Sequence, residues 1–167
     1  VLAGLGGRIA AVLDGGPCPV GVESTIVAVD LPALLREAGL PAEALAAVFG
    51  ADLGAEVPRP ADGGAVRAPG MLASHYAPRG RVRLGATRPE PGEVWIGFGP
   101  EAPGDAGLTL SAAGSVEEAA ARLFSALHEA DARAGPAGQI AVAPVPEQGL
   151  GRAVNDRLRR AAAPRAP

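Results

Sequence analysis

The order of hydrophobic and polar positions predicts short strands and helices near the start of the chain. The segment STIVAVD is rich in β-branched residues and predicts a strand over Ser24–Val29. Pro41 and Gly50 bracket an apolar stripe with helical spacing, so we expect a short helix between them. A helix-like segment is also expected over Leu5–Ile9.

A second series of apolar segments begins at Arg81. The segments VRL, EVWIGFG and LTL, each bounded by Gly or Pro, predict three short strands. Ser115 and Glu118 form a capping box ahead of a predicted helix. The apolar face of this helix carries Val116, Ala120, Leu123, Phe124 and Leu127. QIAVAPV predicts a buried strand, and GLGRAVNDRLRRAAA predicts a closing helix with Val154 and Leu158 inward and its arginines outward. This alternation predicts an open α/β sheet of the Rossmann-like kind.

The two series are separated by residues 53–80, which are rich in Pro and Gly and have no sustained hydrophobic period, as is typical of a linker. The only Met and the only Tyr of the chain, Met71 and Tyr76, lie in this linker beside His75. We therefore expect an α/β part over residues 1–52, a linker over residues 53–80 and a small α/β domain over residues 81–163.

Composition narrows the function classes. The 167 residues include 24 Gly and 17 Pro, but 48% are hydrophobic and the net charge is only −3, which favours a folded chain over disorder. All 15 basic residues are Arg, so a Walker A lysine, a Schiff-base lysine and a Ser-Lys dyad are excluded. The weakly acidic balance argues against nucleic-acid binding driven by phosphate contacts. No apolar run approaches the 18 residues that a membrane span needs.

Several residues invite a chemical interpretation that their surroundings do not support. Gly149-Leu150-Gly151 starts a dinucleotide-binding pattern, but Val154 stands at the third glycine position, so a tight turn into a helix is favoured. His75 and His128 have no second ligand at a metal-binding spacing, and we predict no metal site. The single Cys18 excludes an internal disulfide, and it lies between two prolines without a neighbouring base, as expected of an inert thiol.

Three residues in or after the first predicted strand are better candidates for ligand binding. The hydroxyls of Ser24 and Thr25 either bind the loop backbone, which the composition favours, or hold a small ligand. Arg36 ends an apolar segment, where a planar guanidinium can point at a phosphate. No catalytic residue is assigned.

Four segments carry a family resemblance in their order along the chain: DGGPCPVGVESTIVAVD, LLR, APGMLASHYAP and GLGRAVNDRLRRAA. Together they resemble the two-domain threonylcarbamoyl-AMP synthase family. The resemblance implies that residues 1–52 are the C-terminal part of a YrdC-like catalytic domain and that residues 81–163 are a Rossmann-like accessory domain. It also implies a cytoplasmic nucleotidyltransferase that joins L-threonine, bicarbonate and ATP into threonylcarbamoyl-AMP and pyrophosphate. This is the first step of threonylcarbamoyladenosine (t6A) modification in tRNA processing.

The resemblance assigns roles to three residues. Ser24 matches a residue that holds L-threonine, Arg36 matches an ATP-phosphate contact, and Tyr76 matches a linker residue that reaches over the nucleotide. Mg2+ on the phosphates is implied, as are transferase proteins of the t6A pathway as partners, whereas contact with tRNA is left open and no membrane is expected. An aromatic side chain on a mobile linker would shield a reactive mixed anhydride from water.

The chain departs from the family in two places. Glu37-Ala38-Gly39 replaces the usual Pro-Gly after the arginine, and Glu37 would oppose ATP binding if it faced the site. The N-terminal half of the family, with its Lys, Arg and Ser-x-Asn segment for ATP, has no counterpart here. We therefore expect a C-terminal fragment that is inactive by itself. The alternative is a non-catalytic nucleotide- or partner-binding module built around the second α/β unit.

Overall fold

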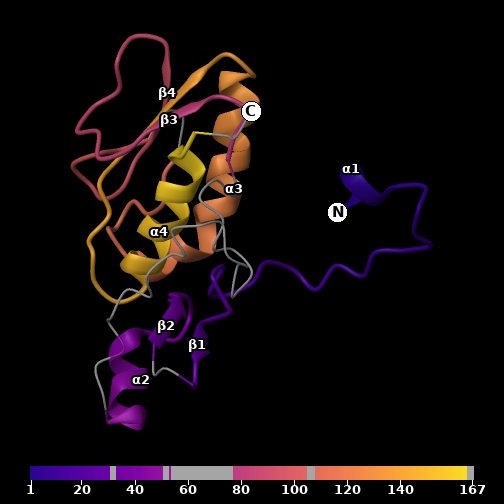
Figure 1. The fold of residues 1–167 in the computed structure, drawn as a ribbon. Helices are drawn as coiled ribbons and strands as arrows, with labels where there is room; N and C mark the ends of the chain where they lie inside the picture. The colour runs from indigo at the N-terminus through magenta and orange to yellow at the C-terminus, as the bar shows by residue number, and fades with distance from the viewer. Residues whose placement is uncertain (31–32, 51–52, 54–76, 105–107, 165–167) are drawn as a thin grey trace.

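The computed structural model describes residues 1–30, 33–50, 53, 77–104 and 108–164, and it has the predicted mixed α/β architecture (Figure 1). Its elements, in chain order, are α1 (Leu2–Leu5), β1 (Ile26–Ala28), β2 (Ala33–Arg36), α2 (Ala42–Phe49), β3 (Arg81–Arg83), β4 (Glu93–Ile96), α3 (Val116–Ala134), β5 (Gln139–Val142) and α4 (Leu150–Ala162). We call residues 1–50 the first unit and residues 77–164 the second unit.

The second unit is built on a three-stranded parallel sheet in the order β3-β5-β4. Alternate residues of β5 point to opposite faces, as a pleated strand requires. Ile140 and Val142 join a buried cluster with residues of α3 and α4, so both helices lie on this face. Ala141 and Trp95 belong to a smaller cluster on the other face. The main core therefore lies between the sheet and the two long helices.

The start of α3 confirms the predicted cap and extends it. The Oγ atom of Ser115 accepts a hydrogen bond from the backbone N–H of Glu118 at 3.1 Å. The carboxylate of Glu118 accepts from the hydroxyl of Ser111 at 2.6 Å, and Ser111 Oγ accepts from the Ser115 N–H at 3.0 Å. Ser111, which is fully buried, thus takes the place that the glutamate occupies in a simple capping box.

The last helix confirms the prediction in part. Val154 and Leu158 of α4 are buried as expected, but Arg157 is only 4% exposed, so the expectation that all arginines face outward is wrong. Its Nη1 atom lies 2.6 Å from the Asp156 carboxylate, which supplies the charge partner that a buried guanidinium needs. A Cβ on Gly151 would lie 1.9 Å from the carbonyl oxygen of Pro146, so this glycine permits close packing of the turn.

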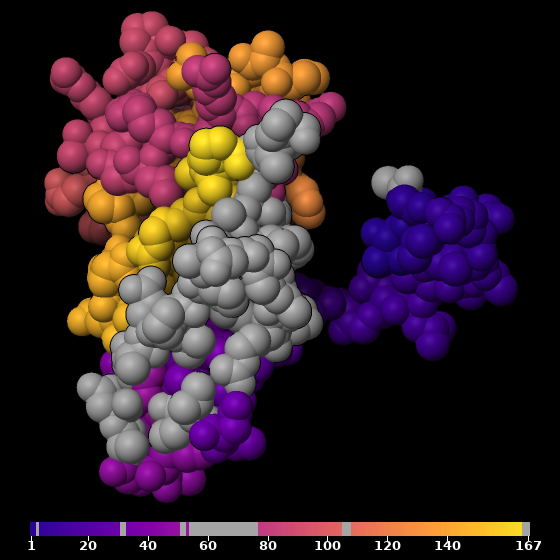
Figure 2. All heavy atoms as spheres, viewed as in Figure 1, coloured from indigo at the N-terminus to yellow at the C-terminus, as the bar shows by residue number. Residues whose placement is uncertain are grey.

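The first unit is smaller and more open. Strands β1 and β2 form an antiparallel pair with Ile26 opposite Arg36. Helix α2 ends at Gly50 in the left-handed conformation, as the sequence predicts, but no residue of α2 is buried. The segment from α1 to residue 18 extends away from the rest of the chain (Figure 2), and its residues from Gly4 onward are exposed.

Two predicted elements differ from the structure. The helix expected over Leu5–Ile9 is wrong, because α1 covers Leu2–Leu5 and the chain leaves the helix at Gly6 and Gly7, the second of which has a φ of 77°. The LTL strand is reduced to one parallel bridge between Gly97 and Thr109. Among the described residues, none of the helices combines the length and the apolar character that crossing a bilayer requires.

Candidate functional site

The structure brings together the two predicted ligand-binding residues that lie in its described part. Arg36, the last residue of β2, donates a hydrogen bond from Nε to the backbone carbonyl of Ser24 at 2.9 Å. Ser24 lies two residues before Ile26, the first residue of β1, and the antiparallel register pairs Ile26 with Arg36, so Ser24 lies close to the end of β2. The guanidinium of Arg36 is therefore oriented by the backbone of the residue predicted to hold L-threonine.

The hydroxyls of Ser24 and Thr25 have different surroundings. Thr25 Oγ1 donates to the carbonyl of Leu40 at 2.9 Å and accepts from the N–H of Leu40 at 3.0 Å. Thr25 thus binds backbone, as the composition favoured, and ties the chain after β2 to the start of β1. Ser24 is exposed, and its hydroxyl makes no hydrogen bond to another described residue.

Glu37, the residue that departs from the family pattern, contacts the second unit. Its Oε1 atom lies 3.0 Å from Nε of Arg152 in the first turn of α4, and Nη2 of the same guanidinium lies 2.6 Å from Oε2 of Glu43. The hydrogen bond from Arg152 holds the pKa of Glu43 below its usual range, and Glu43 in turn raises the pKa of Arg152. Glu37 therefore points at a cation of α4. Sequence reasoning missed Arg152, because its partners are more than a hundred residues away in the chain.

The units also meet through apolar packing. Val22 is 3% exposed and belongs to the main core, with Val20 packed against the same cluster. Between them, Gly21 has a φ of 77°, and a Cβ at this position would lie 2.2 Å from the carbonyl oxygen of Ala120 in α3. The loop before Ser24 is therefore seated directly on α3.

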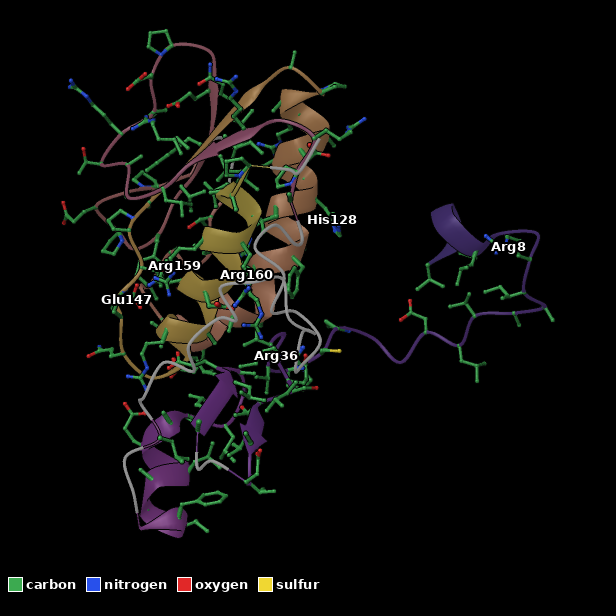
Figure 3. All side chains as sticks on the ribbon, in the orientation of Figure 1. Arg8, Arg36, His128, Glu147, Arg159 and Arg160 are labelled. Atoms are coloured by element: carbon green, nitrogen blue, oxygen red, sulfur yellow. The ribbon has the colours of Figure 1, made fainter. Side chains whose placement is uncertain are left out.

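The third predicted site residue, Tyr76, lies outside the described residues, as do His75 and Met71. The chain is described again at Ala77, and Arg79 then binds Asp131 of α3, with Nε 3.0 Å from Oδ2 and the backbone N–H 2.6 Å from Oδ1. Burial alone would raise the pKa of Asp131, but these hydrogen bonds from Arg79 outweigh it and hold the pKa below its usual value. His128 is exposed on α3 (Figure 3). It lines a hollow of about 540 Å³ with Arg79 and Asp131.

A smaller hollow, of about 260 Å³, lies where β3 and β5 end. Its walls include Gly85, Val145, Asn155 and the exposed ion pair of Glu147 with Arg159. The carboxyl ends of parallel strands are where open α/β sheets hold ligands. Gly149 and Gly151 do not line this hollow, and their part in the structure is the tight turn into α4.

The described residues offer no group of three His, Cys, Asp or Glu side chains that would hold a metal ion. Cys18 is exposed in the extended N-terminal segment.

Comparison with known proteins identifies the family. The family model described as "Threonylcarbamoyl-AMP synthase, C-terminal domain" matches residues 40–163. The chain belongs to this family. A curated threonylcarbamoyl-AMP synthase from Pyrococcus abyssi (strain GE5 / Orsay) is 37% identical over 180 residues, which cover 93% of this chain and 50% of that protein. Another from Bacillus subtilis (strain 168) is 39% identical over 93 residues, covering 52% of this chain and 25% of that protein.

Solved structures of a threonylcarbamoyl-AMP synthase share the fold. The crystal structure of P. abyssi Sua5 complexed with L-threonine superposes with a TM-score of 0.72 and 33% identity, covering 95% of this chain and 51% of that one. A doubly substituted form of the same protein gives a TM-score of 0.61 at 32% identity, covering 89% of this chain and 47% of that one. The chain thus spans about half the length of the Pyrococcus synthase. The matched family domain begins at residue 40, so it includes α2 and leaves out Ser24 and Arg36.

Proposed function

We propose that this chain is part of an L-threonylcarbamoyladenylate synthase, which joins L-threonine, bicarbonate and ATP into threonylcarbamoyl-AMP and releases pyrophosphate. The observation that carries the proposal is the Arg36–Ser24 hydrogen bond, which unites the predicted phosphate and threonine residues at one edge of the first unit. The relative solved with L-threonine supports the amino acid as substrate. The product would serve t6A modification in the cytoplasm, with the pathway's transferase proteins as partners.

In this proposal the described residues act by positioning and by charge. The exposed hydroxyl of Ser24 hydrogen-bonds L-threonine. The guanidinium of Arg36, which the hydrogen bond from its Nε to the Ser24 carbonyl holds in one orientation, neutralises a phosphate of ATP. The amine of L-threonine first condenses with bicarbonate to a carbamate, and water is released. The carbamate carboxylate then attacks the α-phosphorus of ATP, the bond from the α-phosphorus to the bridging oxygen breaks, and pyrophosphate leaves with that oxygen. Mg2+ bound to ATP would supply further charge neutralisation, which is the usual main contribution in phosphoryl-group chemistry.

The chain contains no Lys, so the family's lysine contact to ATP must come from residues outside it. We therefore expect the chain by itself to release no pyrophosphate, whereas a full-length protein that contains it does so only with L-threonine and bicarbonate. In the full-length protein, Arg36→Gln should raise KM for ATP, and Ser24→Ala should raise KM for threonine. Each change should be about tenfold, which corresponds to about 1.4 kcal/mol.

Two results would overturn this proposal. One is threonine-dependent pyrophosphate release by the 167-residue chain alone. The other is a full-length protein in which Arg36→Gln does not raise KM for ATP, and Ser24→Ala does not raise KM for threonine, more than the control variant Arg122→Gln does. That control removes an exposed cation from α3.

Tyr76 is proposed to cover the nucleotide from the linker. Tyr76→Ala in the full-length protein should increase escape of the adenylate by roughly tenfold, about 1.4 kcal/mol, with little change in the thermal midpoint. A variant that retains the adenylate normally but melts several degrees lower would assign Tyr76 to structure instead.

The hollow at the ends of β3 and β5 supports a second candidate, a non-catalytic nucleotide- or partner-binding module. Titration of residues 81–163 with ATP distinguishes the two, with backbone NMR signals as the readout. Shifts at Gly85 and Asn155 would favour the module, and unchanged signals would favour the synthase.

A further inference from the structure

We propose that Arg152 is a positioning residue for Arg36: from α4 it holds the segment that follows β2 and so fixes the orientation of the Arg36 guanidinium. The importance of that orientation for ATP rests on the proposed function above. The contact itself belongs to this chain and is open to measurement in it.

One guanidinium joins two glutamates that flank the connection between β2 and α2. Nε of Arg152 is 3.0 Å from Glu37, directly after β2, and Nη2 is 2.6 Å from Glu43, in the first turn of α2. Because the guanidinium is planar and presents its donors in a fixed fork, it defines the spacing of the two carboxylates. A Lys at this position would not fix that spacing, because its single ammonium group can rotate freely.

The Arg152–Glu37 pair is better protected from solvent than an exposed surface ion pair, whereas the Glu43 side chain is 64% exposed. The side chains of Arg152 and Glu37 are 26% and 29% exposed, whereas those of Arg159 in the same helix and of its partner Glu147, which precedes the helix, are 57% and 56% exposed. Solvent screens a half-buried ion pair less, so Arg152 holds Glu37 more firmly than Arg159 holds Glu147.

The start of α4 and the two glutamates of the first unit have complementary charges. Helix α4 begins at Leu150 after an N-cap glycine, Gly149, so no side chain caps it, and it has no acidic residue in its first turn. Glu37 and Glu43 reach this turn from the first unit and supply negative charge near the positive end of the helix. The first unit thus supplies the negative charge that the first turn of α4 lacks.

Arg36 is linked to this contact through a short and constrained segment. Its Nε is bound to the Ser24 carbonyl, the next residue is held by Arg152, and Ala38 is 2% exposed. If Arg152 lost its charge, the Glu37 carboxylate would be released next to Arg36. It would then compete with phosphate for the Arg36 guanidinium, which is the unfavourable effect expected of an acid at this position.

The first test uses this chain. In Arg152→Gln, solvent exchange of the Arg36 Nε–H and of the β1–β2 amides should speed up about tenfold, while the amides of β5 stay unchanged. Arg122→Gln is the matched control, because it removes the same charge from an exposed pair within α3. If the Arg36 Nε–H and the β1–β2 amides exchange at the same rate in Arg152→Gln as in Arg122→Gln, the proposal is overturned.

The second test uses the full-length protein and separates positioning from folding. Arg152→Gln should raise KM for ATP about tenfold and leave KM for threonine within about twofold. Glu37→Gln should have a smaller effect, and adding it to Arg152→Gln should restore KM to the Glu37→Gln value, because no free acid then remains beside Arg36. A double variant worse than both single variants would overturn the positioning role. If the unsubstituted protein made no adenylate, the proposed function would fail, and the exchange of the Arg36 Nε–H would still decide whether Arg152 orients it.

Discussion

Helices α2 and α3 carry the same kind of apolar stripe, yet the structure uses the two stripes differently. In α3, Leu123 and Leu127 are buried between the sheet and α4. In α2, Val48 is 83% exposed and Phe49 is 43% exposed, and no residue of the helix is buried. Helical spacing predicts that a helix forms, whereas burial depends on what the rest of the molecule places against it. The second unit buries the apolar stripe of its own helix, whereas the stripe of α2 needs contacts from outside the first unit to be buried.

The strongest test of this contrast separates the two parts. Residues 81–163 should fold alone, because they contain the sheet, both long helices and most of the core. Residues 1–52 should remain unfolded, since a two-stranded sheet with an uncovered helix buries too little apolar surface. Amide exchange of each fragment measures this. A protected 1–52 fragment, or an unprotected 81–163 fragment, would contradict the contrast.

A single substitution in each helix gives the next largest difference. Leu123→Ala in α3 should lower the free energy of unfolding by about 3 kcal/mol, because it leaves a cavity in a fully buried site. Val48→Ala in α2 should change it by less than about 0.5 kcal/mol, because the side chain is exposed. Urea unfolding of the full chain provides both values, and a Val48→Ala loss as large as that of Leu123→Ala would show that the stripe of α2 is covered in solution.

Much of the fold could be predicted because its signals are local. The Ser115 cap, the Gly50 helix end and the buried run of β5 each depend on a few adjacent residues. The burial of Arg157 could not be predicted, because a charged side chain in an amphipathic helix is expected to face the solvent. Only the packing around Arg157 shows that it does not.

The site was predictable to a similar extent. Arg36 and Ser24 were singled out from short motifs, and the antiparallel register explains why they meet. Their assigned ligands remain predictions. Arg152 was missed because an ion pair between distant segments has no local pattern, and its two acidic partners look like ordinary surface residues in the sequence.

The seating of the first unit on α3 can be broken at Gly21. Gly21→Ala should lower stability by about 2 kcal/mol, since the new Cβ meets the Ala120 backbone at a position with positive φ. Gly7→Ala is a matched control with the same φ of 77° and no neighbouring atom within 4 Å. Faster exchange of amides near residue 22 in Gly21→Ala, with β5 unchanged, would locate the loss at the contact. Equal effects of the two variants would show that backbone strain alone is responsible.

The smallest expected effect is a difference in acid response between the units. The hydrogen bond from Arg83 holds the pKa of Glu93 in β4 below its usual value of 4.5, and the Glu93 side chain is only 3% exposed. A lowered native pKa means that the contribution is complete above the unfolded value and is lost as the pH falls through the native one. Glu93→Gln should therefore cost about 1 kcal/mol at pH 7, the size of one charge-assisted hydrogen bond, and much less at pH 3. Glu43, whose pKa is also lowered but whose side chain is 64% exposed, should show the same sign with a smaller change. Urea midpoints at the two pH values measure this, and a larger pH dependence for Glu43→Gln than for Glu93→Gln would reverse the order assigned to the two units.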